Sequence, residues 1–277
     1  WDVEKIARGV LPKVIARQLS DFGIVCIKFL KDDNTKLITC GRENIRFWRI
    51  KNGHLPAASV ILNEHGRSQT FNCIAFDDST GQLRVFVGSS KGNVYIVNPK
   101  NRALEGVFKI HEEGVNAIEI SAGFCATAGE DKFLKLWPLD FESIILEAEH
   151  DAPLSSVTFS GNTLQVACGT KSGTIGLVDI ASQGYSFLMR SHEDEVIAMS
   201  LHTPTMSLVT LAHDSKIRVW SVADFSQICD FDSPDDQALS VATHPSQPLF
   251  ACGFASGFMR LFDFDKVEVL QEFKHHE

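Results

Sequence analysis

The sequence predicts an all-β fold made of repeated four-stranded units, and three observations lead to this prediction. Short runs rich in Val, Ile and Phe, bounded by Gly, Asp and Ser, recur along the chain and are strand signals. No stretch shows sustained helical periodicity. A short aliphatic run that ends in an aromatic or bulky residue recurs six times along the chain. The last residues of the six runs are Trp48, Val97, Trp137, Val178, Trp220 and Phe262. These six anchor residues are 49, 40, 41, 42 and 42 residues apart.

The third unit shows how each repeat supplies four strands. Residues 115–121 alternate as an inner strand, and residues 124–129 form the second strand. After a turn at residues 130–132, residues 133–139 form the third strand and residues 143–149 the outer strand. A period of about 40–45 residues with four short strands per unit is typical of the blades of a WD-repeat β-propeller.

The repeat also predicts the domain organisation. Residues 1–20 are predicted to be the end of a preceding blade, in which residues 11–16 form the outer strand. We favour a seven-bladed propeller with six complete blades and this partial one; a closed six-bladed ring with residues 1–20 draped over it is the alternative. A propeller closes to protect its strand edges, so we expect the rest of a longer chain to complete the partial blade. The six complete blades are expected at about 21–62, 63–110, 111–150, 151–191, 192–234 and 235–277.

Composition indicates a soluble protein of a reducing compartment. The 277 residues are 44% hydrophobic and 22% charged, and no apolar stretch approaches the roughly 18 residues of a membrane span. The seven cysteines are odd in number, and no two form a Cys-x-x-Cys pair, which argues against a disulfide framework or a zinc site. We therefore expect a cytoplasmic protein that makes no membrane contact.

The charge is negative overall but unevenly distributed. A net charge of −9 argues against general nucleic-acid binding. Residues 1–50, however, hold 10 Lys or Arg against 6 Asp or Glu, whereas the remainder holds 16 against 29. Either this is chance variation on a solvated surface, or the first fifty residues form a basic edge that faces an acidic partner.

Two units share four polar residues at fixed spacing, with Thr four residues before Asp and Asp six before Trp. In the WD-repeat family, which this chain resembles over nearly its whole length, such residues form a hydrogen-bonded chain within a blade. A buried indole must donate, a buried carboxylate must be satisfied, and an imidazole can bridge them. The predicted structural sets are His111, Thr127, Asp131 and Trp137 in the third unit and His192, Thr210, Asp214 and Trp220 in the fifth.

The remaining units depart from this pattern. At the Asp position they carry Arg42, Lys91, Ser172 and Ser256, so their blades are expected to rely on apolar packing alone. Strand b also repeats a small residue before glycine, and we expect these dipeptides to occupy one position near the propeller axis. They are Cys40-Gly41, Val87-Gly88, Ala128-Gly129, Cys168-Gly169 and Cys252-Gly253.

Nothing in the sequence predicts an enzyme. The His, Thr and Asp residues recur with the structural repeat, and each set is tied to a Trp, so we assign no catalytic residue. There is no HExxH spacing for a metal, no GxxxxGK[ST] loop for nucleotide phosphates and no GxSxG turn. No cofactor and no metal are expected.

A shorter segment narrows the resemblance. Residues 37–42, Leu-Ile-Thr-Cys-Gly-Arg, followed by residues 45–48, Ile-Arg-Phe-Trp, resemble the "TCG…W" blades of microtubule-associated WD propellers. These include the echinoderm microtubule-associated-protein-like family and the centriolar family of WD repeat-containing protein ninety and its proteome-of-centriole relatives. The resemblance implies a non-enzymatic scaffold of centrioles, basal bodies or ciliary axonemes that binds tubulin and neighbouring scaffold proteins. The alternative is an adaptor or substrate receptor unrelated to microtubules.

Basic residues of the first, second and fourth units are the candidate partner-binding residues. Acidic loops at residues 112–113, 193–195 and 235–236 face the same rim, so the charges either serve solubility or make a bipolar docking face. The contact edge for acidic tubulin is expected in the N-terminal portion. The candidates are Arg42, Arg46, Lys51, Arg67, Lys91 and Lys171.

Overall fold

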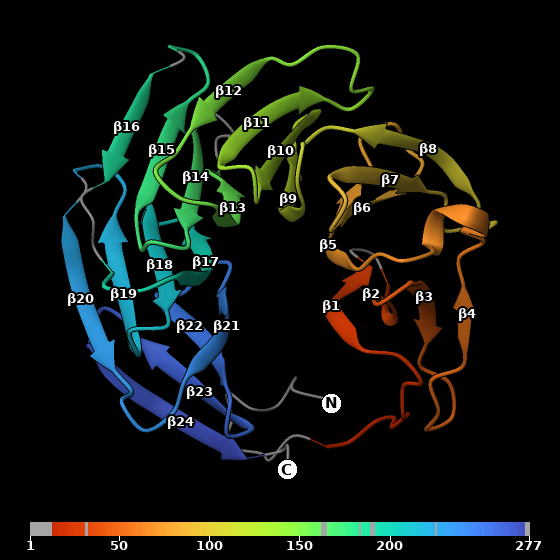
Figure 1. The fold of residues 1–277 in the computed structure, drawn as a ribbon. Helices are drawn as coiled ribbons and strands as arrows, with labels where there is room; N and C mark the ends of the chain where they lie inside the picture. Colours follow the sequence, from red (N-terminus) through yellow and green to blue (C-terminus); the bar gives the residue numbers. More distant parts are fainter. Residues whose placement is uncertain are drawn as a thin grey trace. The chain divides into compact units, whose positions relative to one another are not determined.

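The computed structural model describes residues 13–30, 33–161, 165–182, 184–188, 192–224 and 226–274. Within these ranges the chain folds into six antiparallel sheets of four strands, each formed by four consecutive strands (Figure 1). The described helical structure is one short 3₁₀ turn, η2 (Asn63–Gly66). The chain is therefore all-β with six propeller blades, as the repeat predicted. It divides into two compact units, residues 1–118 and 119–277.

The first unit holds two complete blades, whose strands run in order from the inner to the outer strand. Blade 1 consists of β1 (Ile24–Leu30), β2 (Asp33–Gly41), β3 (Asn44–Arg49) and β4 (Ala57–Ser59). Blade 2 consists of β5 (Phe71–Asp77), β6 (Arg84–Ser89), β7 (Asn93–Val97) and β8 (Leu104–Lys109).

The third sheet begins with β9 (Val115–Ser121), which crosses the boundary between the units, and continues with β10 (Phe124–Gly129), β11 (Phe133–Pro138) and β12 (Leu146–Glu149). Blade 4 contains β13 (Leu154–Phe159), β14 (Gln165–Thr170), β15 (Ile175–Asp179) and β16 (Tyr185–Leu188). Blade 5 contains β17 (Val196–His202), β18 (Ser207–Ala212), β19 (Lys216–Ser221) and β20 (Gln227–Asp232). Blade 6 contains β21 (Ala238–Thr243), β22 (Leu249–Phe254), β23 (Phe258–Asp263) and β24 (Glu268–Lys274).

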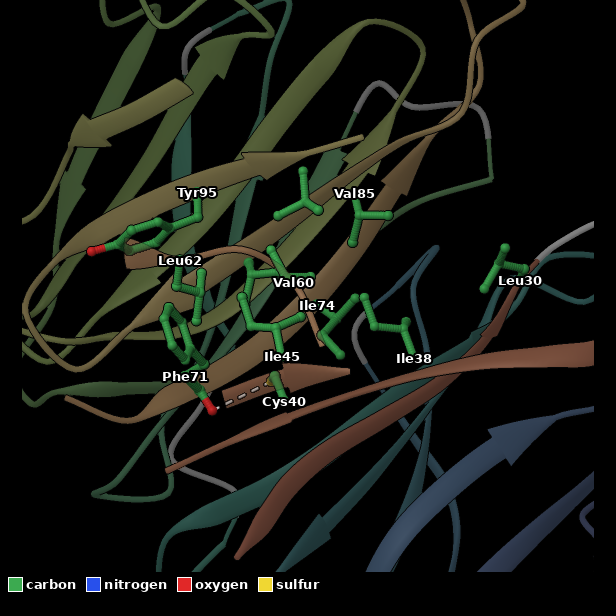
Figure 2. Packing of buried hydrophobic residues seen from close by; sticks show 12 residues of the cluster. Leu30, Ile38, Cys40, Ile45, Val60, Leu62, Phe71, Ile74, Val85 and Tyr95 are labelled. Carbon is green, nitrogen blue, oxygen red and sulfur yellow. Dashed lines mark hydrogen bonds between the residues drawn. The ribbon is translucent and has the colours of Figure 1, made fainter. Parts of the chain in front are cut away.

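Apolar packing joins neighbouring blades within each unit. In the first unit, Phe71 and Ile74 of β5 pack into a buried cluster with Ile38, Cys40 and Ile45 of blade 1 (Figure 2). The thiol of Cys40 also donates to the carbonyl oxygen of Phe71, at 3.3 Å, which ties the two blades together (Figure 2). In the second unit, a corresponding cluster joins blades 5 and 6. Within each unit, the inner strands β5 and β21 thus bury apolar side chains on the preceding blade.

Strand register corrects one sequence prediction. On the second strand, the residue that pairs with the position two before the anchor is Thr39 in blade 1, Cys168 in blade 4 and Cys252 in blade 6. These three residues are therefore structurally equivalent. Cys40 follows Thr39, so it is equivalent to the next residue of the other second strands: Gly88, Ala128, Gly169 and Gly253. The prediction that the small-residue–glycine dipeptides share one position is therefore wrong. The crowded position is the one after Thr39, because a Cβ on Gly88 would lie 2.5 Å from the Cys73 Sγ and 2.8 Å from a methyl group of Val115.

The predicted partial blade is not found among the described residues. Most of residues 1–20, including Trp1, Asp2 and residues 11–12, lies outside the described part of the chain. Residues 14–20 are described and have no regular secondary structure, so residues 14–16 do not belong to the outer strand that we expected.

Candidate functional sites

Blade 5 brings its four predicted residues together in one hydrogen-bonded chain. His192, in the loop before β17, places Nδ1 3.0 Å from an Asp214 carboxylate oxygen and Nε2 2.8 Å from the Thr210 hydroxyl. The Trp220 indole donates to the same hydroxyl at 2.9 Å. The chain therefore links the loop before the inner strand, the second strand, the turn after it and the third strand.

Asp214 is the charged centre of this arrangement. Its carboxylate accepts from the backbone N–H groups of Glu193 and Lys216, both at 3.1 Å, and lies 3.5 Å from the guanidinium of Arg218. Burial alone would raise the pKa of Asp214, but these N–H groups and the neighbouring imidazole outweigh burial and hold the pKa below its usual value. Burial also lowers the pKa of His192, although the Asp214 charge opposes that effect.

Blade 3 carries the second predicted set. Its indole donor, Trp137, reaches the Thr127 hydroxyl at 3.3 Å, and the Asp131 carboxylate accepts from the N–H of Phe133 at 3.3 Å. His111 and Thr127 are buried. The two blades therefore place the same Thr–Trp pair in the same part of the sheet.

The prediction of purely apolar packing in the other blades is wrong for all four of them. In blade 2 the Gln69 amide donates to the buried Tyr95 hydroxyl at 3.0 Å. In blade 1 the Trp48 indole donates to Thr39 at 2.7 Å, nine residues away instead of ten, so the pair escaped a search at fixed spacing. In blade 6, Asp236 accepts from Ser256 and lies 3.4 Å from Arg260. Polar residues thus hold these blades with different spacings from the family pattern.

Blade 4 replaces the Thr with a cysteine. The Cys168 Sγ lies 2.9 Å from His150 Nε2, and the hydroxyls of Ser172 and Thr174 donate to the Asp151 carboxylate at 3.0 and 3.1 Å. The Asp has moved from the turn to the residue after the histidine. A search that allowed this exchange would have found the set in the sequence.

The hydroxyl and the thiol at the centre of the sets in blades 5 and 4 are inaccessible to solvent. The Thr210 hydroxyl is fully buried, as is the Cys168 thiol, so neither can reach an external substrate. Burial raises the pKa of Cys168 to about 12, which keeps it a thiol although His150 is in contact. The His, Thr, Cys and Asp residues of the blades therefore act as structural hydrogen-bonding groups.

Among the residues that the structure describes, no three His, Cys, Asp or Glu side chains gather closely enough to hold a metal ion. In the same part of the chain, no helix has the length and apolar character needed to cross a membrane.

Three of the six candidate cations gather at one end of blades 1 and 2. Arg42 follows β2 and makes a backbone bridge to Thr70, three residues after Arg67. The Lys91 ammonium donates to the Arg67 carbonyl oxygen at 3.4 Å. Arg42, Arg67 and Lys91 are all exposed. We call these three residues the basic turn cluster.

The other candidates lie elsewhere. Arg46 forms an ion pair with Asp21, and its guanidinium lies 4.8 Å from the centre of the Phe22 ring, so it fastens the segment before β1. Lys51 follows β3 and lies at the opposite end of the blade from Arg42. Lys171, in the second unit, is paired with Glu130 at 2.9 Å.

The chain is similar to centriolar and microtubule-associated proteins along its full length. It is 34% identical to WD repeat-containing protein 90 of Xenopus tropicalis and 31% identical to centriole proteome protein 16 of Chlamydomonas reinhardtii, in both cases over 100% of this chain. It is 27% identical to echinoderm microtubule-associated protein-like 2 of Rattus norvegicus over 98% of this chain. The chain spans 16%, 14% and 41% of these three proteins, respectively.

A solved structure and a protein family agree with the fold. The computationally designed Ika8 protein superposes with a TM-score of 0.72 at 18% identity, covering 91% of this chain and 74% of that one, which supports the fold alone. The β-propeller family described as nucleolar protein 10-like, N-terminal domain, matches residues 64–262. The resemblance to WD-repeat propellers of centriolar and microtubule-associated proteins is thereby confirmed. The chain belongs to the nucleolar protein 10-like N-terminal β-propeller family.

Proposed function

We propose that this propeller is a non-enzymatic scaffold that binds microtubules in centrioles, basal bodies or ciliary axonemes. The observation that carries the proposal is the basic turn cluster, which presents Arg42, Arg67 and Lys91 at one end of two adjacent blades. Tubulin is acidic, and exposed cations attract an acidic surface over a distance of about 8 Å at physiological salt. The names of the related proteins support the same cellular setting.

Hydrogen bonds hold the backbone around the cations of the basic turn cluster. The Lys109 ammonium donates to the carbonyl oxygens of Lys91 and Glu112, both at 2.9 Å, and adds a fourth positive charge beside Lys91. Glu43 is the nearest acid next to Arg42, and its carboxylate accepts from the Ser68 N–H at 2.8 Å. These bonds fix the backbone that carries the cations, and the side chains of Arg42 and Arg67 remain exposed to a partner.

Co-pelleting with taxol-stabilised microtubules tests the proposal. We expect the double variant Arg42→Glu/Arg67→Glu to bind about tenfold more weakly, because two attractive contacts become repulsive. The matched control is Arg49→Glu/Lys100→Glu, which makes the same charge change in the same two blades at the opposite ends of β2 and β3. That control should pellet within twofold of the unsubstituted protein.

Two outcomes would contradict the proposal. If the intact protein does not pellet with microtubules at all, the scaffold binds another partner, as an adaptor unrelated to microtubules would. If it pellets but both double variants bind equally well, the contact lies outside the basic turn cluster.

We also propose that a further blade packs on the inner strand of blade 1, giving a seven-bladed propeller. Ile24 and Ile27 of β1 are 43% and 57% exposed, whereas Phe71 and Ile74, at the same positions of β5, are fully buried on blade 1. Val196 of β17 is likewise fully buried. Exposed β-branched side chains at a position that is buried in other blades indicate a face on which another blade packs.

Labelling of an introduced thiol tests the seventh blade. The variant Ile24→Cys should react quickly with maleimide in this 277-residue chain and at least tenfold more slowly in a longer protein that contains the covering blade. An exposed control, Lys132→Cys, should react equally fast in both. Equal rates for Ile24→Cys would contradict the proposal.

A further inference from the structure

A pocket of about 490 Å³ lies in the first unit, at the ends of the strands far from the basic turn cluster. Its floor is apolar and includes Trp48, Phe47 and Leu30 of blade 1 and Leu83 and Pro99 of the loops of blade 2. A pocket of this size and lining is typical of sites that bind a ligand through buried apolar groups.

The same pocket has a positive rim. Lys36, Arg49 and Lys100 line it, and Lys36 and Arg49 are direct partners across strands β2 and β3. Asp33 neutralises Lys36 at 2.9 Å. Arg49 and Lys100 are exposed and have no ion-pair partner among the described residues, so the rim keeps two unneutralised positive charges.

Hydrogen bonds to neighbouring groups hold the residues of the pocket in place. The indole N–H of Trp48 is engaged by Thr39 at 2.7 Å, so the ring is fixed and offers the pocket its apolar surface. The N–H of Arg49 donates to the carbonyl oxygen of Pro56 at 3.1 Å, and the N–H of Lys100 donates to the Asn98 side chain at 2.9 Å. A pre-formed site loses little conformational entropy on binding.

We propose that this pocket binds an acidic peptide segment that inserts a large apolar side chain between the two blades. Carboxylates on either side of the inserted side chain would meet Arg49 and Lys100. A small anion is disfavoured, since an anion held by Arg49 and Lys100 alone would leave the apolar lining of the pocket uncovered. The site is separate from the proposed microtubule contact because it lies at the other ends of β2 and β3.

Fluorescence anisotropy with a defined probe tests the proposal. The probe is a labelled hexapeptide in which Phe-Leu is flanked by two glutamates on each side. Control peptides replace Phe-Leu by Ser-Ser or all glutamates by lysines. Both controls should bind at least tenfold more weakly, because each removes one of the two complementary features.

Two variants locate the binding. Arg49→Glu/Lys100→Glu should weaken probe binding about tenfold, and Ala57→Trp, which fills the pocket from the exposed strand β4, should weaken it by a similar factor. The matched control, Arg42→Glu/Arg67→Glu, should bind the probe within twofold of the unsubstituted protein. Circular dichroism melting verifies that each variant is folded; if Ala57→Trp does not fold, the charge variant alone locates the site.

Several results would overturn the proposal. They are no probe binding by the unsubstituted protein, equal binding of the Ser-Ser peptide, displacement of the probe by millimolar phosphate alone, or equal weakening by both charge variants. Microtubule pelleting by the Arg49→Glu/Lys100→Glu variant is a separate readout, so failure of the pocket and failure of the microtubule contact are distinguishable.

Discussion

Blades 1 and 5 form the same four-stranded sheet but differ in the number of side-chain hydrogen bonds that link their strands. In blade 5, Thr210 bonds both Trp220 and His192, and His192 is bonded to Asp214. In blade 1 the corresponding Thr39 bonds Trp48, and Arg42 follows the second strand where blade 5 has its Asp-containing turn. Both sheets nevertheless have four strands in the same order. The Thr–Trp bond is therefore the common element, and the His and Asp are additions to it.

The arginine two residues before each Trp shows how the two blades differ electrostatically. Arg218 of blade 5 lies 3.5 Å from Asp214, and both side chains are almost completely buried. Arg46 of blade 1 pairs with Asp21, an exposed carboxylate in the segment before β1. A buried pair leaves an uncompensated charge when one partner is removed, whereas an exposed pair is replaced by water. The comparison therefore predicts a large cost in blade 5 and a small one in blade 1.

The largest effect is expected for Asp214→Ala. Loss of this carboxylate removes the charge beside the buried Arg218 and the acceptor of His192 and of the Glu193 and Lys216 N–H groups, and we expect the free energy of unfolding to fall by about 3–5 kcal/mol. Urea unfolding followed by Trp fluorescence measures this. Asp21→Ala in blade 1 is the control and should cost less than about 1 kcal/mol. Equal costs would show that burial does not distinguish the two pairs.

The next effect comes from the threonines. Thr210→Val removes the acceptor of Trp220 and the partner of His192, and should cost about 2–4 kcal/mol, because each buried polar group left unsatisfied costs about 1–3 kcal/mol. Thr39→Val leaves one indole N–H unsatisfied and should cost about 1–2 kcal/mol. Thermal melts of both variants provide the test. A larger cost for Thr39→Val would reverse the assignment of blade 5 as the more extensively bonded blade.

A pH effect of moderate size should belong to blade 5. Because the pKa of His192 is lowered by burial, the unfolded chain takes up a proton at higher pH than the folded chain. The stability from neutral His192 is present above about pH 6.5 and is lost as the pH falls below that value, by at most about 1.4 kcal/mol per pH unit. The pKa of Asp214 is also lowered, so its contribution is lost only below about pH 3.9.

Urea midpoints at pH 5, 6 and 7.5 measure this dependence. His192→Asn should be less stable than the unsubstituted protein at pH 7.5 and should show a flatter profile between pH 5 and 6.5. Thr39→Val should keep the original slope, since the Thr39–Trp48 pair does not titrate. An unchanged slope in His192→Asn would assign the pH dependence to another histidine, such as His150, whose pKa burial also lowers.

The smallest effect is expected at the first residue of each inner strand. Ile24→Ser in blade 1 should change the free energy of unfolding by less than about 0.5 kcal/mol, because Ile24 is already largely exposed. Val196→Ser at the same position of blade 5 should cost about 2–4 kcal/mol, since it places an unpaired hydroxyl in the core and leaves a cavity. Differential scanning calorimetry distinguishes these outcomes. A large cost for Ile24→Ser would mean that its face is already packed in this chain.

Particular residues show where sequence reasoning succeeded and where it did not. The His192, Thr210, Asp214 and Trp220 spacing was readable because strand length and turn length are fixed within that blade. The Thr39–Trp48 bond was missed since the turn between β2 and β3 is one residue shorter, with Glu43 at a φ of 54°. The set of blade 4 was missed because its aspartate, Asp151, has moved to the other side of the same hydrogen-bonding site.

The candidate binding residues illustrate the limits of spacing arguments more strongly. Arg42, Arg46 and Lys51 are close in sequence and were expected to form one contact edge. An extended strand separates its two ends by about 3.3 Å per residue, so Arg42 and Lys51 lie at opposite ends of the blade. The pocket between Trp48, Leu83 and Pro99 had no sequence signal, because its walls come from the strands of blade 1 and from separate loops of blade 2.

The sequence by itself determined the repeat, the all-β class, six complete blades and the His–Thr–Asp–Trp set of blade 5. These features follow from periodicity and from the need of buried polar groups for partners, both of which are local properties of the chain. Only the tertiary structure decided which cations gather, which are neutralised, and which apolar side chains stay exposed. Those outcomes depend on contacts between blades that are tens of residues apart, and no local pattern encodes such contacts.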